Sequence, residues 1–260
     1  MTATETKHED VLRVLALVPP LAVRLYGDGT EAALQRLQLL VLALAIAWGW
    51  SVLFAPRDGR PAGPGLVPFA VTFALLLPGP VGWGAAALAL SFGTVFGREI
   101  FGGRPVLPPA AVALAFAVFS FPEGGFEAQG ILSQPPDFLF ASSCLPGAAL
   151  LAWRGILPWR VAAGAAAGAV AVALAMGDAA WWEQFGLGSF AAGVLFLAAA
   201  PEGAIRGHAG WLHGLMVGAL IVTIRLANPD QPDGVVFVVL LGGLFAPLLE
   251  RAVAWRPSRD

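Results

Sequence analysis

The chain has 260 residues, and only 12% of them are charged, whereas 58% are hydrophobic. A soluble domain carries about twice that charged fraction. Because a bilayer core of roughly 30 Å needs about 20 apolar residues per spanning helix, length and composition exclude a soluble domain and predict an all-α, polytopic membrane protein. The single cysteine, Cys144, excludes an intrachain disulfide, and the absence of a Cys/His cluster leads us to expect no metal site.

Ten apolar segments follow one another along the chain, and each is predicted to be a transmembrane helix. They lie near 11–27, 37–55, 64–79, 81–97, 106–121, 138–153, 161–176, 186–200, 211–227 and 234–250. Several are shorter than about 20 residues, so we expect tilting or extension by flanking glycines and aromatics. The first segment is the weakest, because Pro19 and Pro20 interrupt it. The alanine- and glycine-rich seventh segment is typical of close helix packing.

The basic residues gather in alternate loops, and this asymmetry supports the number of spans. Of the fifteen basic residues, twelve fall on one predicted side: Lys7, Arg13, Arg57, Arg60, Arg98, Arg104, Arg154, Arg160, Arg206, Arg251, Arg256 and Arg259. The opposite side holds only Arg24, Arg36 and Arg225. The positive-inside rule therefore predicts that both termini lie in the cytoplasm.

Ten spans divide into two halves of five, roughly residues 1–130 and 131–260 of one membrane domain. An odd number of spans per half gives the two halves opposite orientations, as in an inverted repeat. Glycines and prolines interrupt the fourth–fifth junction at 102–109 and the ninth–tenth junction at 229–234. Such paired breaks indicate a ligand site near the midplane, although two ordinary interhelical turns explain them equally well.

The segment from Arg98 to Arg104 places one acid and two bases at the end of an apolar helix. Gly102 and Gly103 would allow the backbone to approach a ligand closely, and a neighbouring cation can hold an anionic or electron-rich group. Arg98, Gly102, Gly103 and Arg104 are therefore the candidate cofactor-binding residues. The simpler interpretation, which the residues alone favour, is a cytoplasmic helix end with an Arg98–Glu99 pair and a turn.

Two carboxylates are candidates for an ion pathway, Glu99 and Asp233. Asp233 opens the last predicted helix, where a carboxylate caps free N–H groups or faces a cation entrance. His213 is either a proton carrier or an interfacial histidine. No residue is assigned to catalysis, because the chain lacks a dinucleotide fingerprint, a phosphate-binding loop and a supported Ser-His-Asp arrangement. No basic patch beyond the loops indicates nucleic-acid binding.

Four stretches resemble the NqrB/RnfD family, membrane subunits of the sodium-translocating NADH:quinone reductase and of the related Rnf complex. They are TVFGREIFGG at 94–103, LAWRGILPWRV at 151–161, GLMVGALIVTIR at 214–225 and PDGVVFVVLLGGLFAPLLER at 232–251. These stretches follow the family's order through nearly the whole chain. The resemblance implies a ten-helix fold in two halves, in a bacterial cytoplasmic (inner) membrane.

The resemblance also implies a redox subunit that is not expected to act alone. It would belong to a translocase of the NADH:quinone or ferredoxin:NAD oxidoreductase type, in which flavins carry electrons and Na⁺ or H⁺ moves. Its partners would be the lipid bilayer, other membrane subunits of the complex or an FMN-carrying protein.

The sequence departs from this family at the motif that attaches the flavin. Members usually attach FMN covalently to a threonine in a Ser-Gly-Ala-Thr stretch between the fifth and sixth helices. Here no threonine occurs between Thr94 and Thr223, and Ser133 lacks the surrounding motif. We therefore expect no covalent FMN, and we expect a noncovalent flavin, riboflavin or FMN, near Gly102 and Gly103.

Two other functions stay open. A transporter or channel of the same fold, without redox chemistry, would fit the missing threonine. A membrane scaffold for a flavoprotein or a biosynthetic enzyme would also retain the fold without a site of its own.

Overall fold

The structure is a computed structural model that describes residues 3–54, 65–77, 81–101, 107–121, 135–200, 205, 207–228 and 234–254. The described residues form helices joined by turns, with no strand among them. This confirms the predicted all-α class. Ten α-helices are present within these ranges, and each one overlaps a predicted segment.

The first five helices are α1 (Ala3–Gly27), α2 (Gly29–Leu53), α3 (Leu66–Leu76), α4 (Trp83–Gly97) and α5 (Pro109–Ser120). The next five are α6 (Phe138–Trp153), α7 (Trp159–Ala175), α8 (Phe190–Ala192), α9 (Ala209–Ala227) and α10 (Val235–Ala254). Two 3₁₀ turns, η1 (Glu99–Phe101) and η3 (Trp181–Phe185), lie among them. The eighth segment departs from prediction, because α8 is a single turn that continues as the π-helix η4 (Gly193–Ala198).

Three described helices are long and apolar enough to cross a membrane: α2, α9 and α10. Four shorter apolar helices, α3, α5, α6 and α7, accompany them. The chain is therefore a multi-pass membrane protein by the length and composition of its helices. The cytoplasmic placement of the termini stays a prediction.

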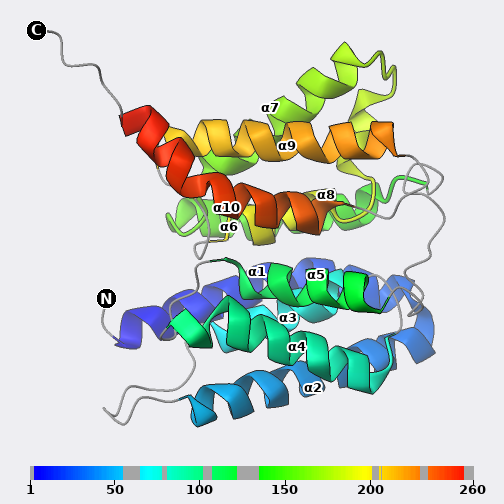
Figure 1. The fold of residues 1–260 in the computed structure, drawn as a ribbon. Helices are drawn as coiled ribbons and strands as arrows, with labels where there is room; N and C mark the ends of the chain where they lie inside the picture. The colour runs from blue at the N-terminus through cyan, green and yellow to red at the C-terminus, as the bar shows by residue number, and fades with distance from the viewer. Residues whose placement is uncertain are drawn as a thin grey trace, which may run out of the picture.

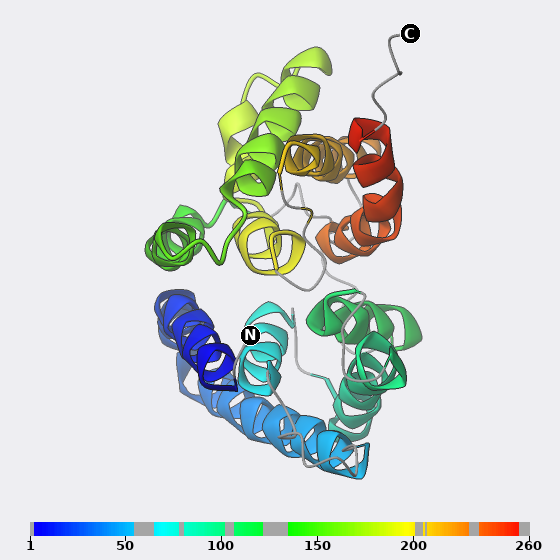
Figure 2. The same cartoon turned by 90° about the vertical axis from the view of Figure 1, so that its left-hand side faces the viewer.

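The helices assemble into two groups, α1 to α5 and α6 to α10, which lie against one another (Figure 1). The same two groups are separate in the view turned by 90° (Figure 2). At their boundary α1 packs on α6 and α5 packs on α10. Gly147 of α6 lies so close to α1 that an added Cβ would collide with the backbone of Ala16. The inverted relation between the groups stays a prediction.

Each group has a short element at its centre. In α3, ten of eleven residues are buried, so this helix faces protein on every side. It begins after Gly65, whose φ of 84° suits a residue without a Cβ. Most of α8 and η4 is buried as well. Because both elements are too short to cross a bilayer, their ends need hydrogen-bond partners inside the protein.

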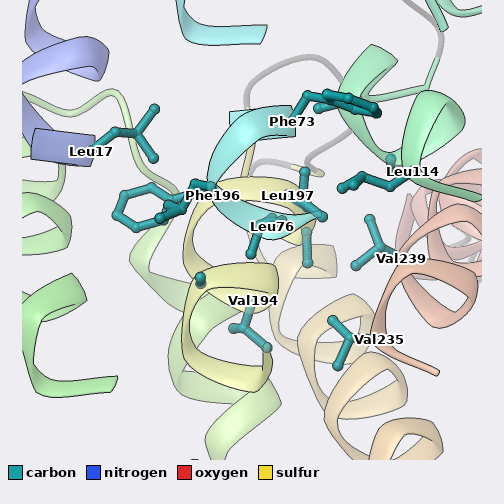
Figure 3. Close-up of a cluster of buried hydrophobic side chains, with 14 of the residues drawn as sticks. Leu17, Phe73, Leu76, Leu114, Val194, Phe196, Leu197, Val235 and Val239 are labelled. Atoms are coloured by element: carbon teal, nitrogen blue, oxygen red, sulfur yellow. The ribbon is translucent and has the colours of Figure 1, made fainter. Parts of the chain in front are cut away.

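Apolar side chains fill the space where the two groups meet. Leu76 of α3, Leu197 of η4 and Val239 of α10 belong to one buried cluster (Figure 3). Phe73 and Leu114 have no exposed surface. We call these described side chains, where the two groups meet, the apolar layer.

Glycines bring α7 and α9 together backbone to backbone. Gly164 and Gly168 of α7, and Gly214 and Gly218 of α9, lie where an added Cβ would collide with the backbone of the facing helix. This confirms the close packing that the composition of the seventh segment predicts.

Candidate functional site

Arg98 and Glu99 lie together at the end of α4. The helix ends at Gly97, because the backbone of Arg98 (φ −145°, ψ −57°) leaves the helical region and η1 begins at Glu99. Gly97 packs on α5, where an added Cβ would lie 2.9 Å from Pro109 Cα. The Arg98 Nε and Glu99 Oε1 atoms are 3.7 Å apart, and both side chains are nearly buried.

Ser51, near the end of α2, completes a cluster with these two residues. Its hydroxyl donates a hydrogen bond of 3.2 Å to Glu99 Oε1, and the residue is 3% exposed. We name this group the Ser51–Arg98–Glu99 cluster. Opposite charges and a hydroxyl donor compensate one another here, which is what a low-dielectric environment requires of buried polar groups.

The other predicted site residues lie outside the described residues. These are Gly102, Gly103 and Arg104 of the cofactor-binding set, and Asp233 of the ion pathway. The structure thus brings together Arg98 and Glu99 from the predicted list and adds Ser51, which no sequence pattern marked.

Thr94 and Thr223, the two threonines nearest the loop where the family carries FMN, use their hydroxyls within their own helices. The Thr94 hydroxyl is buried and donates to the carbonyl of Leu90, and the Thr223 hydroxyl donates to the carbonyl of Ala219. Both are occupied within their own helices. Next to the predicted glycine pair in the sequence, Ile100 and Phe101 of η1 each expose about half of their area.

The three arginines on the predicted opposite side are all engaged with the protein. Arg36 pairs with Asp28 through Nε and Nη2, each 2.7 Å from Oδ2. Its Nη1 donates to the carbonyl of Ala74 at 2.6 Å, in the last turn of α3. Arg36 therefore satisfies a carbonyl that the end of a short helix leaves without an intrahelical partner.

In the second group of helices, Arg225 likewise donates hydrogen bonds to carbonyls beside a short buried helix. It is 1% exposed, and its two terminal nitrogens donate to the carbonyls of Gln184 (3.0 Å) and Leu187 (2.9 Å), just before α8. The Phe190 ring lies 5.7 Å from its Cζ. The charge asymmetry of the sequence singled out both arginines, but it gave no indication of burial.

His213 is buried in α9, one turn from the start of the helix, and is 1% exposed. Its Nδ1 has no hydrogen-bond partner among the described residues. The ring lies against Gly242 of α10, where an added Cβ would be 3.2 Å from the imidazole Cε1. His213 is therefore packed between α9 and α10, and both interpretations, a proton carrier or an interfacial histidine, stay predictions.

Fold and cluster together define a class: a polytopic helical membrane protein with short buried helices at its centre and a buried ion pair at one helix end. The pattern of the NQR2, RnfD, RnfE family matches residues 1–132 and 138–258. The chain belongs to this family, as its sequence motifs suggest.

Relatives within the family are subunits B of Na⁺-translocating NADH-quinone reductases. That of Pseudomonas aeruginosa (strain LESB58) is 29% identical over an alignment of 273 residues. The match covers 86% of this chain and 68% of the relative. That of Stutzerimonas stutzeri (strain A1501) is 27% identical over 281 residues, covering 88% and 69%. That of Azotobacter vinelandii (strain DJ / ATCC BAA-1303) is 28% identical over 275 residues, covering 86% and 68%.

Proposed function

We propose that this chain is a membrane subunit of an electron-transport complex, in which flavin-linked electron transfer is coupled to translocation of Na⁺ or H⁺. Family membership supports this proposal, because the relatives are named as subunits of a Na⁺-translocating reductase. The chain works with other membrane subunits or an FMN-carrying protein, and not alone. It resides in a bacterial cytoplasmic membrane with both termini in the cytoplasm.

The flavin site of the proposal is noncovalent and lies at the end of α4. Gly102 and Gly103 let the backbone approach a flat ring, and the exposed Phe101 offers an aromatic surface to pack on it. Arg104 supplies a positive charge for a phosphate or an electron-rich ring edge. A bound flavin would accept and donate electrons there, while the protein residues bind and orient it.

The cation pathway of the proposal uses the carboxylates Glu99 and Asp233. A cation is strongly disfavoured in the apolar layer formed by side chains such as Leu76 and Leu197. Passage therefore requires that layer to open, and coupling to a redox step would prevent a permanent leak.

An absorption spectrum of the detergent-purified chain tests the proposal first. A noncovalent flavin is expected to give flavin absorption bands in the native protein and to be found in the supernatant after acid denaturation. Flavin that stays on the denatured chain would contradict our expectation of no covalent FMN. A colourless protein that also fails to bind added riboflavin or FMN would contradict the flavin site itself.

Substitution of the glycine pair tests the location. Gly102→Val with Gly103→Val is expected to abolish flavin binding, because two branched side chains fill the approach. Gly84→Val is the matched control, since an added Cβ there meets no atom within 4 Å. Equal flavin content in both variants would mean that Gly102 and Gly103 do not form the flavin site.

A transporter or channel without redox chemistry is the second candidate, favoured by the absence of a threonine between Thr94 and Thr223. It predicts solute uptake by the purified chain in liposomes without a bound chromophore. Uptake that depends on an electron donor and partner subunits supports the redox subunit instead.

A further inference from the structure

A cavity of about 200 Å³ opens where α1 ends and α6 begins. Its lining includes Val23, Arg24, Tyr26, Asp28, Asp137 and Leu139. The long apolar helix α2 begins at Gly29, directly after α1. Because α2 is a candidate span, its first residues mark the level of a membrane surface, and the cavity lies at that level.

Arg24 enters this cavity without a polar partner. Its Cζ lies 4.2 Å from the centroid of the Phe140 ring, and its Nε is buried without a hydrogen bond. Within the described chain, none of its nitrogens makes a hydrogen bond or an ion pair within 4.0 Å. A guanidinium has five N–H donors, and the one on Nε is buried here without an acceptor, which is unfavourable. A ligand with acceptor oxygens in the cavity would therefore stabilise the site.

The two carboxylates of the cavity differ in how far they are already satisfied. Asp28 accepts both short contacts from Arg36 on its Oδ2. Asp137 accepts a hydrogen bond of 2.8 Å from the backbone N–H of Phe140 on its Oδ1. Its Oδ2 accepts none from the described residues. Asp137 therefore keeps one carboxylate oxygen available for a donor in the cavity.

Arg24 and Asp137 thus line one cavity without pairing with one another. A simple anion would be repelled by the two carboxylates, and a simple cation by Arg24 and its neighbour Arg36. A ligand that carries both charges a few bonds apart satisfies both groups. Leu139, which is 67% exposed, gives the cavity an apolar border, and Tyr26, which is 91% exposed, is typical of a membrane interface.

The geometry points to a binding site for the phosphoethanolamine head group of a phospholipid. The phosphate oxygens accept hydrogen bonds from the Arg24 guanidinium, and the primary ammonium donates to Asp137. The acyl chains leave along the exposed apolar surface next to Leu139. This inference is independent of the proposed redox function, because it rests on the cavity alone.

Short-chain lipids added to the detergent-purified full chain test the site by its thermal unfolding midpoint. Dioctanoyl phosphatidylethanolamine is expected to raise the midpoint by about 2–4 °C near saturation. The phosphatidylcholine analogue should act more weakly, because its trimethylammonium group has no N–H to donate.

The variants Arg24→Gln and Asp137→Asn should both abolish the preference for phosphatidylethanolamine over phosphatidylcholine. The asparagine side chain retains the capping acceptor for α6. Arg154→Gln, at an exposed arginine away from the cavity, should keep the preference.

Several outcomes would overturn the assignment. Equal shifts from phosphatidylethanolamine, phosphatidylcholine and phosphatidylglycerol would indicate nonspecific solvation. A dominant shift from phosphatidylglycerol that survives Asp137→Asn would indicate an anion site. Free phosphoethanolamine acting as strongly as the lipid would indicate a soluble ligand. If Arg24→Gln does not fold, the lipid preference of the wild-type chain and of Asp137→Asn decides.

The chain itself is a competing occupant, since Glu123 and Glu127 belong to the segment before Asp137. A Glu123→Gln, Glu127→Gln double variant separates the two cases. An unchanged lipid preference in this variant supports the head-group site. A loss of stability in the double variant, together with no lipid preference in the wild-type chain, would overturn it.

Discussion

Arg225 is the largest of the fully buried side chains in the described part of the chain. Arg225→Met should remove donors from the carbonyls of Gln184 and Leu187 while keeping most of the side-chain volume. We expect a loss of about 3 kcal/mol, or a midpoint roughly 6–12 °C lower, because two buried carbonyls lose a charged donor. The measurement is thermal unfolding in detergent.

Thr223→Ala is the control for Arg225→Met on the same helix, because the Thr223 side chain is exposed and bonded only within α9. Its midpoint should stay within about 2 °C of the wild-type value. Equal midpoints for the two variants would mean that Arg225 does not hold the segment before α8.

Glu99→Gln separates the two interpretations of the Ser51–Arg98–Glu99 cluster. Glutamine keeps an acceptor for the Ser51 hydroxyl but removes the negative charge beside Arg98. If Glu99 lies on a cation pathway, redox-driven cation uptake by the reconstituted complex should fall by about tenfold or more, because a cation loses its counter-charge. Ser51→Ala, which keeps the charge, should leave uptake within about twofold. Equal uptake by the Glu99→Gln complex and the wild type would mean that the cluster only ends a helix and has no role in cation movement.

At single residues, the sequence could identify unusual charges but not their environment. Arg24, Arg36 and Arg225 are exceptions to the loop asymmetry, and the structure engages each one with the protein. Their partners include carbonyls 38 to 41 positions away, which only tertiary packing brings near. Ser51 was missed for the same reason, because Glu99 is 48 positions further along the chain.

The packing of α7 on α9 gives a prediction at the scale of elements. Gly218→Ala should destabilise the chain by about 1–3 kcal/mol, because its Cβ would meet the Ala165 backbone and force the helices apart. Gly49→Ala in α2 is the matched control, since an added Cβ there meets no atom within 4 Å. Alanine favours the helix over glycine, so this control should be neutral or more stable by up to about 1 kcal/mol. A higher midpoint for Gly218→Ala in detergent would show that the close contact is not required.

The helices could be predicted from the sequence because each apolar run is long and ends at glycine, proline or charged residues. The eighth segment is the exception. Residues 186–200 carry no charge and are apolar except for Ser189, but the structure forms η3, one turn of α8 and the π-helix η4 near them. Hydropathy depends on composition and is insensitive to a change from i→i+4 to i→i+5 hydrogen bonding, so no periodicity marks such a π-helix.

For the whole molecule, the number of helices followed from composition and charge, whereas the arrangement of the short helices did not. Both α3 and η4 contribute side chains to the buried cluster where the two groups meet. The predicted glycine–proline breaks, in contrast, lie at junctions outside the described residues. Family resemblance supplied the flavin expectation, which the described residues neither place nor test.

The apolar layer gives a prediction for the whole molecule. Purified wild-type chain in liposomes, without an electron donor, should pass no Na⁺ above the lipid background, because the apolar layer holds no group that replaces a cation's hydration shell. Phe73→Ala removes a fully buried ring from this layer. Passive Na⁺ flux should then rise by about tenfold, which corresponds to a barrier lower by about 1.4 kcal/mol. Phe92→Ala is the control, because Phe92 stacks on Phe96 and Phe116 but is not itself a member of the buried cluster, and its loss should not raise the flux. Equal flux from the two variants, with both folded, would mean that the barrier to cations lies elsewhere in the chain.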